Sequence, residues 1–171
     1  MFCDRAIAVY HIGSTAVPGL AAKPIIDILV VLEDTRSIQS FDAAMEALGY
    51  RARGECLDAT IPGTPGRFYF TKDTAGVRTH HVHACAQGHS EIQDKLAFRD
   101  YLRAHPADAA SYGQLKHRLA LAHRHDNIGY MQGKDAFVNA LLADARRQYQ
   151  AGRNIESEPT GPRDVNIAPD Q

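Results

Sequence analysis

One stretch of the sequence decides the fold: His11-Ile-Gly-Ser-Thr-Ala-Val-Pro-Gly-Leu-Ala-Ala-Lys-Pro-Ile-Ile-Asp-Ile-Leu-Val-Val31. Its first part is small and polar over Gly13–Thr15, which predicts a tight turn. From Pro24 to Val31 the residues are almost all apolar, a pattern typical of a strand buried on both faces. Asp27 is the one charge in this run. A carboxylate inside such a strand is costly unless it is paired, hydrogen-bonded or bound to a metal ion.

The turn and the carboxylate together suggest a site for phosphate and metal. Gly13 has no Cβ, so its backbone can approach a ligand closely. Ser14 and Thr15 add hydroxyls beside main-chain N–H groups, and arrays of N–H groups hold anions such as phosphate. Asp27 would hold a divalent cation that bridges to the phosphate, since Mg²⁺ keeps substrate phosphates among its oxygen ligands. In the alternative interpretation Gly13 only forms a turn, and Asp27 bonds to neighbouring backbone or to Lys23.

A second cluster of polar residues lies in the expected strand Val77–Cys85. His81 and His83 are two positions apart, so they point to one face of the strand, and their neighbours point to the other. Two imidazoles on one face can ligate a metal ion or contact phosphate. In the alternative interpretation one is a hydrogen-bonded strand histidine and the other is solvated.

Several segments of the sequence resemble the GrpB family. They are the opening stretch His11–Ile28, then Arg67-Phe-Tyr-Phe70, Thr79-His-His-Val-His83, Leu96-Ala-Phe-Arg-Asp-Tyr-Leu-Arg-Ala-His-Pro106, and Tyr130 followed by Lys134. The likeness runs from about residue 6 to residue 150. The family is similar to the polymerase-β-like nucleotidyltransferase superfamily, whose mark is a Gly-Ser turn followed by a strand with Asp-x-Asp. The family also occurs fused to dephospho-CoA kinase.

The resemblance implies a nucleotide such as ATP as the ligand, an unknown acceptor, and Mg²⁺ or Mn²⁺ as the metal ion. Asp27, His81 and His83 would be the catalytic residues, and Asp27 and His83 would hold the metal. The two histidines stand where the superfamily carries a third acid. In the fold that the resemblance implies, their strand lies beside the strand of Asp27, so we expect Asp27, His81 and His83 to converge on one site. Eight residues are expected to contact the nucleotide and its phosphates: Gly13, Ser14, Thr15, Lys23, Arg67, Arg99, Tyr130 and Lys134. The cations among them would neutralise phosphate charge, because phosphoryl transfer relies on positioning and electrostatics.

One departure from the superfamily keeps other functions open. The second acid of Asp-x-Asp would stand at position 29 or 25, where this chain has Leu29 and Ile25. Two-metal catalysis needs carboxylates that clamp two ions, which one aspartate cannot do. One alternative is therefore a non-catalytic nucleotide-binding or folding-assistance module. A further alternative is a metal-dependent hydrolase that uses Asp27, His81 and His83.

The pattern of apolar residues predicts an α+β fold. We expect a mixed, largely antiparallel sheet of about five strands, one early helix and a C-terminal helical group. The strands are expected at Ala6–Ile12, Pro24–Val31, Tyr50–Cys56, Arg67–Lys72 and Val77–Cys85. The early helix would have Asp34 or Thr35 as its N-cap and would end at Gly49. Its apolar stripe is expected at Ile38, Phe41, Met45 and Leu48. A proline–glycine loop, Ile61–Gly66, is expected near the site.

The sequence predicts three helices in the C-terminal part. Ser90 and Gln93 predict a capping box, and the helix that it opens should end before Pro106, which suits the first turn of the next helix. That second helix should bury Tyr112, Leu115, Leu119 and Ala122. Its basic residues, Lys116 among them, should lie largely on the outer side. A final helix is expected from about Asn127 to Gln150.

The chain of 171 residues is long enough for one domain with a real core. A net charge of −1 argues against a broad basic surface, so nucleic acid is not an expected partner. Three cysteines without metal-like spacing suggest reduced thiols and a cytoplasmic location. No apolar run approaches the roughly 20 residues that span a membrane.

The domain is expected over residues 1–150. Residues 151–171 are predicted to be a disordered tail, because Pro, Gly, Asp and Glu dominate there without an apolar period. The resemblance also implies a further N-terminal segment of a few tens of residues, with a helix in it. This chain starts almost at the first strand, so the segment would be lost or the start assigned late.

Overall fold

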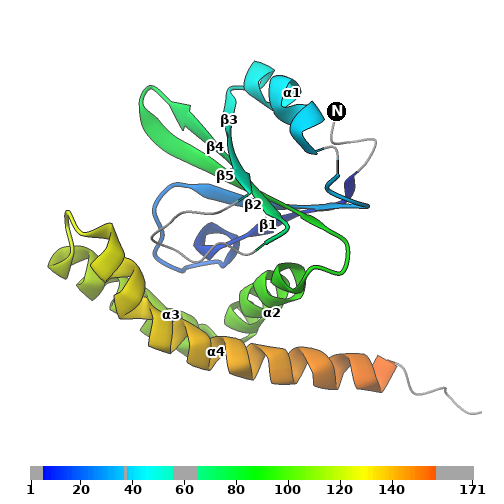
Figure 1. Ribbon diagram of the computed structural model, residues 1–171. Helices are drawn as coiled ribbons and strands as arrows, with labels where there is room; N and C mark the ends of the chain where they lie inside the picture. Colours follow the sequence, from blue (N-terminus) through cyan, green and yellow to red (C-terminus); the bar gives the residue numbers. More distant parts are fainter. Residues whose placement is uncertain (1–5, 37, 56–64, 157–171) are drawn as a thin grey trace, which may run out of the picture.

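A mixed sheet forms the centre of the computed structural model, which describes residues 6–36, 38–55 and 65–156. Within these residues the sheet has five strands in the order β1-β2-β5-β4-β3 (Figure 1). Their bounds are β1 Ala6–Ile12, β2 Ile26–Leu32, β3 Tyr50–Glu55, β4 Arg67–Thr74 and β5 Val77–Ala86. β2 and β5 run parallel, and the other neighbouring pairs are antiparallel. The predicted mixed, largely antiparallel sheet is confirmed.

One row of residues crosses the whole sheet. Ile12 lies opposite Asp27, and Asp27 lies opposite His81. His81 in turn lies opposite Thr71, and Thr71 lies opposite Arg51. Residues directly opposite one another point to the same face, so these five side chains share one face of the sheet.

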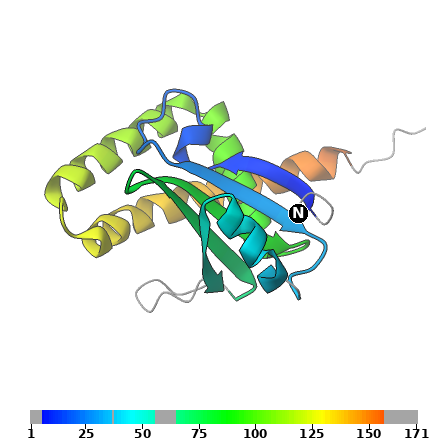
Figure 2. The ribbon, with the colours of Figure 1, turned by 90° about the horizontal axis from the view of Figure 1, so that it is seen from above.

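Helices cover the two faces of the sheet unequally. The short η3 (Ile38–Phe41) and α1 (Asp42–Ala47) lie on one face, as the view from above shows (Figure 2). On the other side lie α2 (Ser90–Ala104), α3 (Pro106–Ala122) and α4 (Asn127–Glu156). The predicted early helix and C-terminal helical group are therefore confirmed. None of the described helices is both long enough and apolar enough to cross a membrane.

Three apolar clusters hold these layers together. Val30, Phe70 and Val82 belong to the cluster between the sheet and α1. Leu29 and Cys85 belong to the cluster on the opposite face, where Ile92 and Leu96 of α2 pack against the sheet. This division confirms the predicted strand parity of β5.

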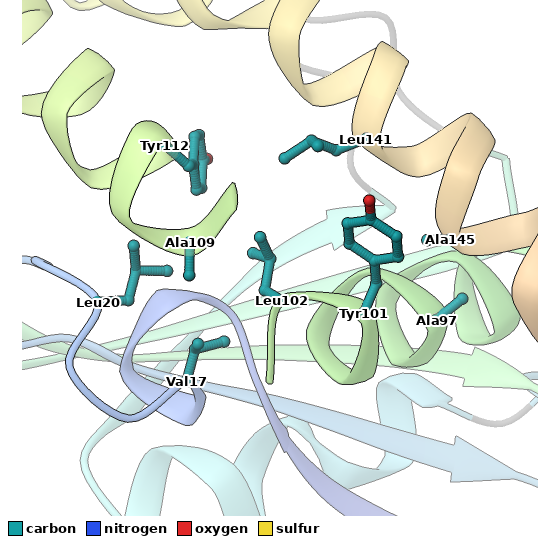
Figure 3. Close-up of a cluster of buried hydrophobic side chains, with 9 residues drawn as sticks. All are labelled: Val17, Leu20, Ala97, Tyr101, Leu102, Ala109, Tyr112, Leu141 and Ala145. Carbon is teal, nitrogen blue, oxygen red and sulfur yellow. The ribbon is translucent and has the colours of Figure 1, made fainter. Parts of the chain in front are cut away.

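The third cluster ties the loop before β2 to the helices. Val17 and Leu20 of this loop pack with Leu102, Tyr112 and Leu141, which come from three different helices (Figure 3). The loop also carries η2 (Ser14–Ala16), so the helices set the position of the Gly13–Thr15 turn.

The early helix is shorter than the sequence predicted. Residues from Ile38 form a 3-10 turn, and α1 begins after Phe41 without a side-chain cap, so neither Asp34 nor Thr35 is its N-cap. The Asp34 carboxylate instead accepts the Arg36 backbone N–H. Gly49, with φ of 82°, stands just past the helix as predicted. Leu48 was expected in the core and is exposed, because it lies at the C-cap, beyond the helical stripe.

Two further details of the helices were predicted wrongly. The N-cap of α2 is His89 rather than Ser90, and its Nδ1 accepts the backbone N–H of Glu91. The buried stripe of α3 consists of Ala109, Tyr112, Gly113 and Lys116. Leu115 and Leu119 are only half-buried and Ala122 is exposed. Helical spacing supports the observed stripe, and a lysine can join it because its methylene stem packs against apolar surface.

Two predicted segments fall partly outside the described residues. α4 continues to Glu156 rather than ending at Gln150, and the predicted tail beyond that point lies outside. In the Ile61–Gly66 loop only Pro65 and Gly66 are described. The Pro65 carbonyl accepts a hydrogen bond from His89 Nε2 at 2.8 Å, near α2 rather than near Asp27.

Candidate functional site

Gly13 and Asp27 are in direct contact at the point where β1 ends. Gly13 has φ of 71° and ψ of −171°, a conformation that side chains rarely allow. A Cβ atom at this position would overlap the Asp27 carboxylate, including Oδ2. The predicted close approach of the Gly13 backbone therefore exists, and the group it approaches within the chain is the carboxylate of the next strand.

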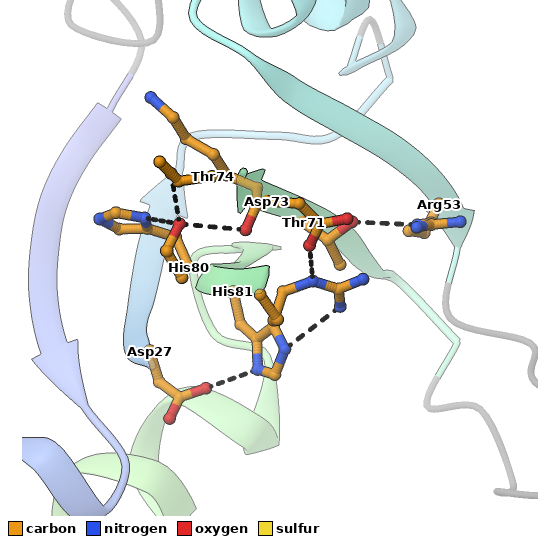
Figure 4. A network of polar contacts seen from close by, with 10 residues as sticks. Asp27, Arg53, Thr71, Asp73, Thr74, His80 and His81 are labelled. Carbon is orange, nitrogen blue, oxygen red and sulfur yellow. Dashed lines mark hydrogen bonds and ion pairs between the residues drawn. The ribbon is translucent and has the colours of Figure 1, made fainter. Parts of the chain in front are cut away.

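His81 fixes the orientation of the Asp27 carboxylate (Figure 4). Its Nδ1 lies 3.0 Å from Asp27 Oδ1, and Arg78 Nη1 lies 3.4 Å from its Nε2. A guanidinium can only donate, so Nε2 accepts and the proton of the neutral ring is on Nδ1, donated to Asp27. Arg78 is in turn paired with Asp73. One ring nitrogen of His81 thus holds Asp27 and the other contacts Arg78, while the Asp27 side chain remains 25% exposed.

His83 lies deeper on the same face. Its ring stacks on Tyr69, with ring centroids 5.1 Å apart. Burial, with a smaller contribution from Lys95 and other cations, lowers the pKa of His83 to about 2, so the ring is neutral. Its Nδ1 is buried and has no hydrogen-bond partner among the described residues. The neutral His83 ring can therefore donate or accept a hydrogen bond, or bind a metal ion, through a nitrogen that no described protein group uses.

A cavity of about 340 Å³ opens between the sheet and the helices at this point. Its polar lining includes Gly13, Asp27, His83, Lys95, Arg99 and Lys134. Asp27 and His83 thus line one cavity. His81 is not among the lining residues, but it is hydrogen-bonded to Asp27.

The described side chains offer few ligands for the expected metal ion. Among residues 6–36, 38–55 and 65–156, no group of three or more His, Cys, Asp or Glu side chains could hold a metal. Protein ligands alone therefore do not form a metal site here. Asp27 Oδ2 fits Mg²⁺ or Mn²⁺ in the mode that uses one carboxylate together with substrate phosphates and water.

Lys116 and Lys134 approach the turn from helices α3 and α4, and Lys23 lies in the loop that follows the turn. Lys116 Nζ donates to Ser14 Oγ at 2.8 Å and to the Ala21 carbonyl at 2.6 Å, and this side chain is only 8% exposed. Lys23 and Lys134 both place their Nζ atoms against the Tyr130 ring, at 5.7 and 5.4 Å from its centroid.

These lysines repel one another. Burial and then the charge of Lys134 lower the pKa of Lys116 to about 8. Burial also lowers the pKa of Lys134, and Lys95 and Lys23 add to this effect against the attraction of Asp135 and Asp27. No ion pair joins Lys23, Lys116 or Lys134 to a carboxylate within the described chain. A set of cations without a matching anion is suited to binding one.

Lys116 is the site residue that sequence reasoning missed. The rule that charged helix positions face solvent placed it on the outer side of α3. Its spacing from Ala109, Tyr112 and Gly113 was the signal that could have revealed it, because these small or aromatic residues form one helical stripe.

Three predicted phosphate ligands are occupied by other contacts. Arg67 pairs with Glu91 at 3.2 Å and lies opposite Cys85, well along β5 from His81. Arg99 lines the cavity, but its guanidinium donates to the His11 carbonyl and pairs with Asp100. The Thr15 hydroxyl donates to the Ile25 carbonyl and contacts His11 Nε2. Their contacts stabilise the turn and its surroundings.

Comparison with known proteins places the chain in a family. A family model described as GrpB protein matches residues 2–144, and the chain belongs to the GrpB family. The UPF0157 protein YqkA of Bacillus subtilis is 44% identical over 154 residues, which are 90% of this chain and 43% of YqkA. The chain thus spans less than half the length of that relative. The family name specifies no reaction.

The fold agrees with a solved member of the family. The crystal structure of conserved protein GrpB from Enterococcus faecalis matches with a TM-score of 0.77 at 41% identity, covering 87% of this chain and 86% of that one. A relative named dephospho-CoA kinase, from Mycolicibacterium paratuberculosis, is 33% identical over 130 residues. The match covers 66% of this chain and 32% of the relative, which is consistent with a fused arrangement.

The Gly13–Asp27 contact predicts unequal effects of two alanine substitutions. Gly19 has a similar φ of 75°, but a Cβ there would meet nothing within 4 Å. We expect Gly19→Ala to lose about 1 kcal/mol of unfolding free energy through backbone strain alone. Gly13→Ala should lose at least about 1 kcal/mol more, because the methyl group also displaces Asp27. Urea denaturation measures both values, and equal losses would contradict the contact.

The depressed pKa of Lys116 predicts a pH-dependent stability. Between the folded value of about 8 and the ordinary value of 10.5, the unfolded state binds more protons, so stability rises with pH. The stability gained in this way is complete above the unfolded-state pKa of 10.5, and it is lost as the pH falls through the folded-state pKa of about 8. From about pH 7 to 10, the unfolding free energy of the wild type relative to Lys116→Met should rise by about 1 kcal/mol, after allowance for solvent screening.

The matched control is Arg118→Met, which removes an exposed cation of the same helix. Chemical denaturation at several pH values should give no such trend for this variant relative to the wild type. A flat or falling difference for Lys116→Met would show that its ammonium group is not desolvated in the folded protein.

Proposed function

We propose that the protein binds nucleotide phosphates, ATP among them, on the Gly13–Thr15 turn and acts as a nucleotidyltransferase-like protein. One observation carries the proposal: Gly13 lets the backbone of the turn lie against Asp27, while Lys116 contacts Ser14 from behind. The site thereby combines a carboxylate for a metal ion with cations for phosphate. A cytoplasmic setting, where ATP and Mg²⁺ are both present, fits this function.

The residues around the turn have separate roles in this proposal. Lys134 and Lys23 neutralise phosphate charge. Burial is the main cause that lowers the pKa of Lys134, and a bound anion would offset the cost of burying its charge. Lys116 positions Ser14 through its hydrogen bond. His81 holds Asp27 Oδ1 by a hydrogen bond, and Oδ2 faces the Gly13 turn. A metal ion bound at Asp27 would polarise the phosphate oxygens.

A specific observation favours a second candidate, the non-catalytic nucleotide-binding or folding-assistance module. Leu29, where the second acid of Asp-x-Asp would stand, is completely buried against Ile12 and Cys85. Because Leu29 belongs to the core, Asp27 is the one acid of β2 that could bind a metal ion. The hydrolase alternative needs His81 as a metal ligand, and both of its ring nitrogens already contact protein groups.

Calorimetric titration with ATP in the presence of Mg²⁺ tests the binding site. We expect Lys134→Gln to weaken binding about tenfold or more, since a charged hydrogen bond contributes about 1.5–3 kcal/mol. Asp27→Asn should abolish the dependence of binding on Mg²⁺. Lys72 is the matched control, because its Nζ also lies on a tyrosine ring, Tyr50, at 5.2 Å, but outside the cavity. Lys72→Gln should bind ATP as the wild type does.

Two outcomes separate the candidates and one overturns both. Release of pyrophosphate with bound ATP supports the transferase, and ATP binding without turnover supports the module. Equal ATP affinity in the wild type, Lys134→Gln and Asp27→Asn would contradict the assignment of phosphate to this turn.

A further inference from the structure

Three arginines surround one carboxylate on the β3–β5 half of the face that carries Asp27. Arg78 pairs with Asp73. The hydrogen bond from Arg78, together with the charges of Arg78, Arg51 and Arg53, lowers the pKa of Asp73. No ion pair in the described ranges joins Arg51 or Arg53 to a carboxylate. This part of the sheet therefore has two more positive charges than negative ones.

Arg53 is held in a geometry suited to an anion. Its Nε donates to Thr71 Oγ1 at 3.0 Å, and Thr71 is 2% exposed (Figure 4). The bond fixes the guanidinium plane and leaves both terminal nitrogens for a ligand, since no other bond to them is found among the described residues. A fixed guanidinium binds phosphate or carboxylate oxygens in pairs and loses little conformational freedom on doing so.

The arginines lie in line with Asp27. The row Asp27, His81, Thr71, Arg51 runs across four neighbouring strands, and strands lie about 4.8 Å apart. The backbone of Arg51 is therefore about 14 Å from that of Asp27. Between the two positions the Tyr69 ring lies beside His81 and His83.

We infer that Arg51, Arg53 and Arg78 bind the anionic group of the acceptor, a small molecule that carries a phosphomonoester. The inference rests on the proposed function, because it assigns the second substrate of that site. A phosphomonoester carries close to two negative charges near pH 7, which matches the excess of positive charge. An extended molecule anchored there can place its other end near Asp27. The overall net charge of −1 argues against a long nucleic acid as the ligand.

Calorimetric titration with ribose 5-phosphate tests the inference without requiring turnover. Wild type and Asp27→Asn should bind this probe equally. Arg53→Gln should weaken binding about tenfold, the effect expected for one charged hydrogen-bond donor pair. Arg51→Gln should weaken it by a smaller factor, because Arg51 is not held by Thr71. Arg36→Gln, which removes an 88% exposed arginine paired with Asp34, is the matched control and should bind as the wild type does.

The variants distinguish failure of this inference from failure of the proposed function. If Lys134→Gln weakens ribose 5-phosphate binding and Arg53→Gln does not, the probe uses the Gly13–Thr15 turn and the inference is wrong. Absence of binding to the wild type at millimolar concentration also overturns it. A short single-stranded oligonucleotide that binds more tightly than ribose 5-phosphate, and loses affinity in Arg53→Gln, would assign the arginines to nucleic acid instead. Loss of ATP binding alone, with the arginine effects intact, would count against the nucleotide site only.

Discussion

The contact between the Gly13 backbone and the Asp27 carboxylate is the constraint on which the rest of the site depends. An acid on a strand inside a sheet needs a polar environment, and here one oxygen accepts a hydrogen bond from His81 while the other lies over the turn. Only a glycine permits the turn to come so close. The two features that the sequence pattern joins, a Gly-Ser turn and a strand with one acid, are thus parts of one structural unit.

The helices help to hold the turn in this position. Arg103 Nε donates to the Ala16 carbonyl at 2.9 Å, and Lys116 reaches Ser14 and Ala21. These three bonds join the loop to helices α2 and α3, and the apolar contacts of Val17 and Leu20 also hold the loop against the helices. Burying Lys116 for this purpose is unfavourable for its charge, as its lowered pKa of about 8 indicates. A bound phosphate would relieve that cost, so the site and the scaffold that supports it favour the same ligand.

Much of this arrangement could be predicted from the sequence, and the failures have physical causes. Apolar runs predicted the strands, and strand parity predicted that His81 and His83 share a face, because alternation along a strand is strict. The meeting of Asp27 with His81 depends on β2 lying beside β5, which the resemblance to the family implied. The burial of Lys116 could not be predicted, because it depends on a loop that packs on α3 from far away in the sequence. For the same reason Arg67 was expected at the phosphates, although its partner Glu91 lies on α2.

The most direct test of the account is a crystal structure of the protein with Mn²⁺ and a non-hydrolysable ATP analogue. Anomalous diffraction locates Mn²⁺ independently of the protein density. The account predicts the anomalous peak within about 2.0–2.6 Å of Asp27 Oδ2, with phosphate oxygens between the metal and the Gly13–Thr15 turn and in contact with Lys134. An ordered nucleotide whose phosphates lie elsewhere, with Asp27 bonded only to His81, would contradict it.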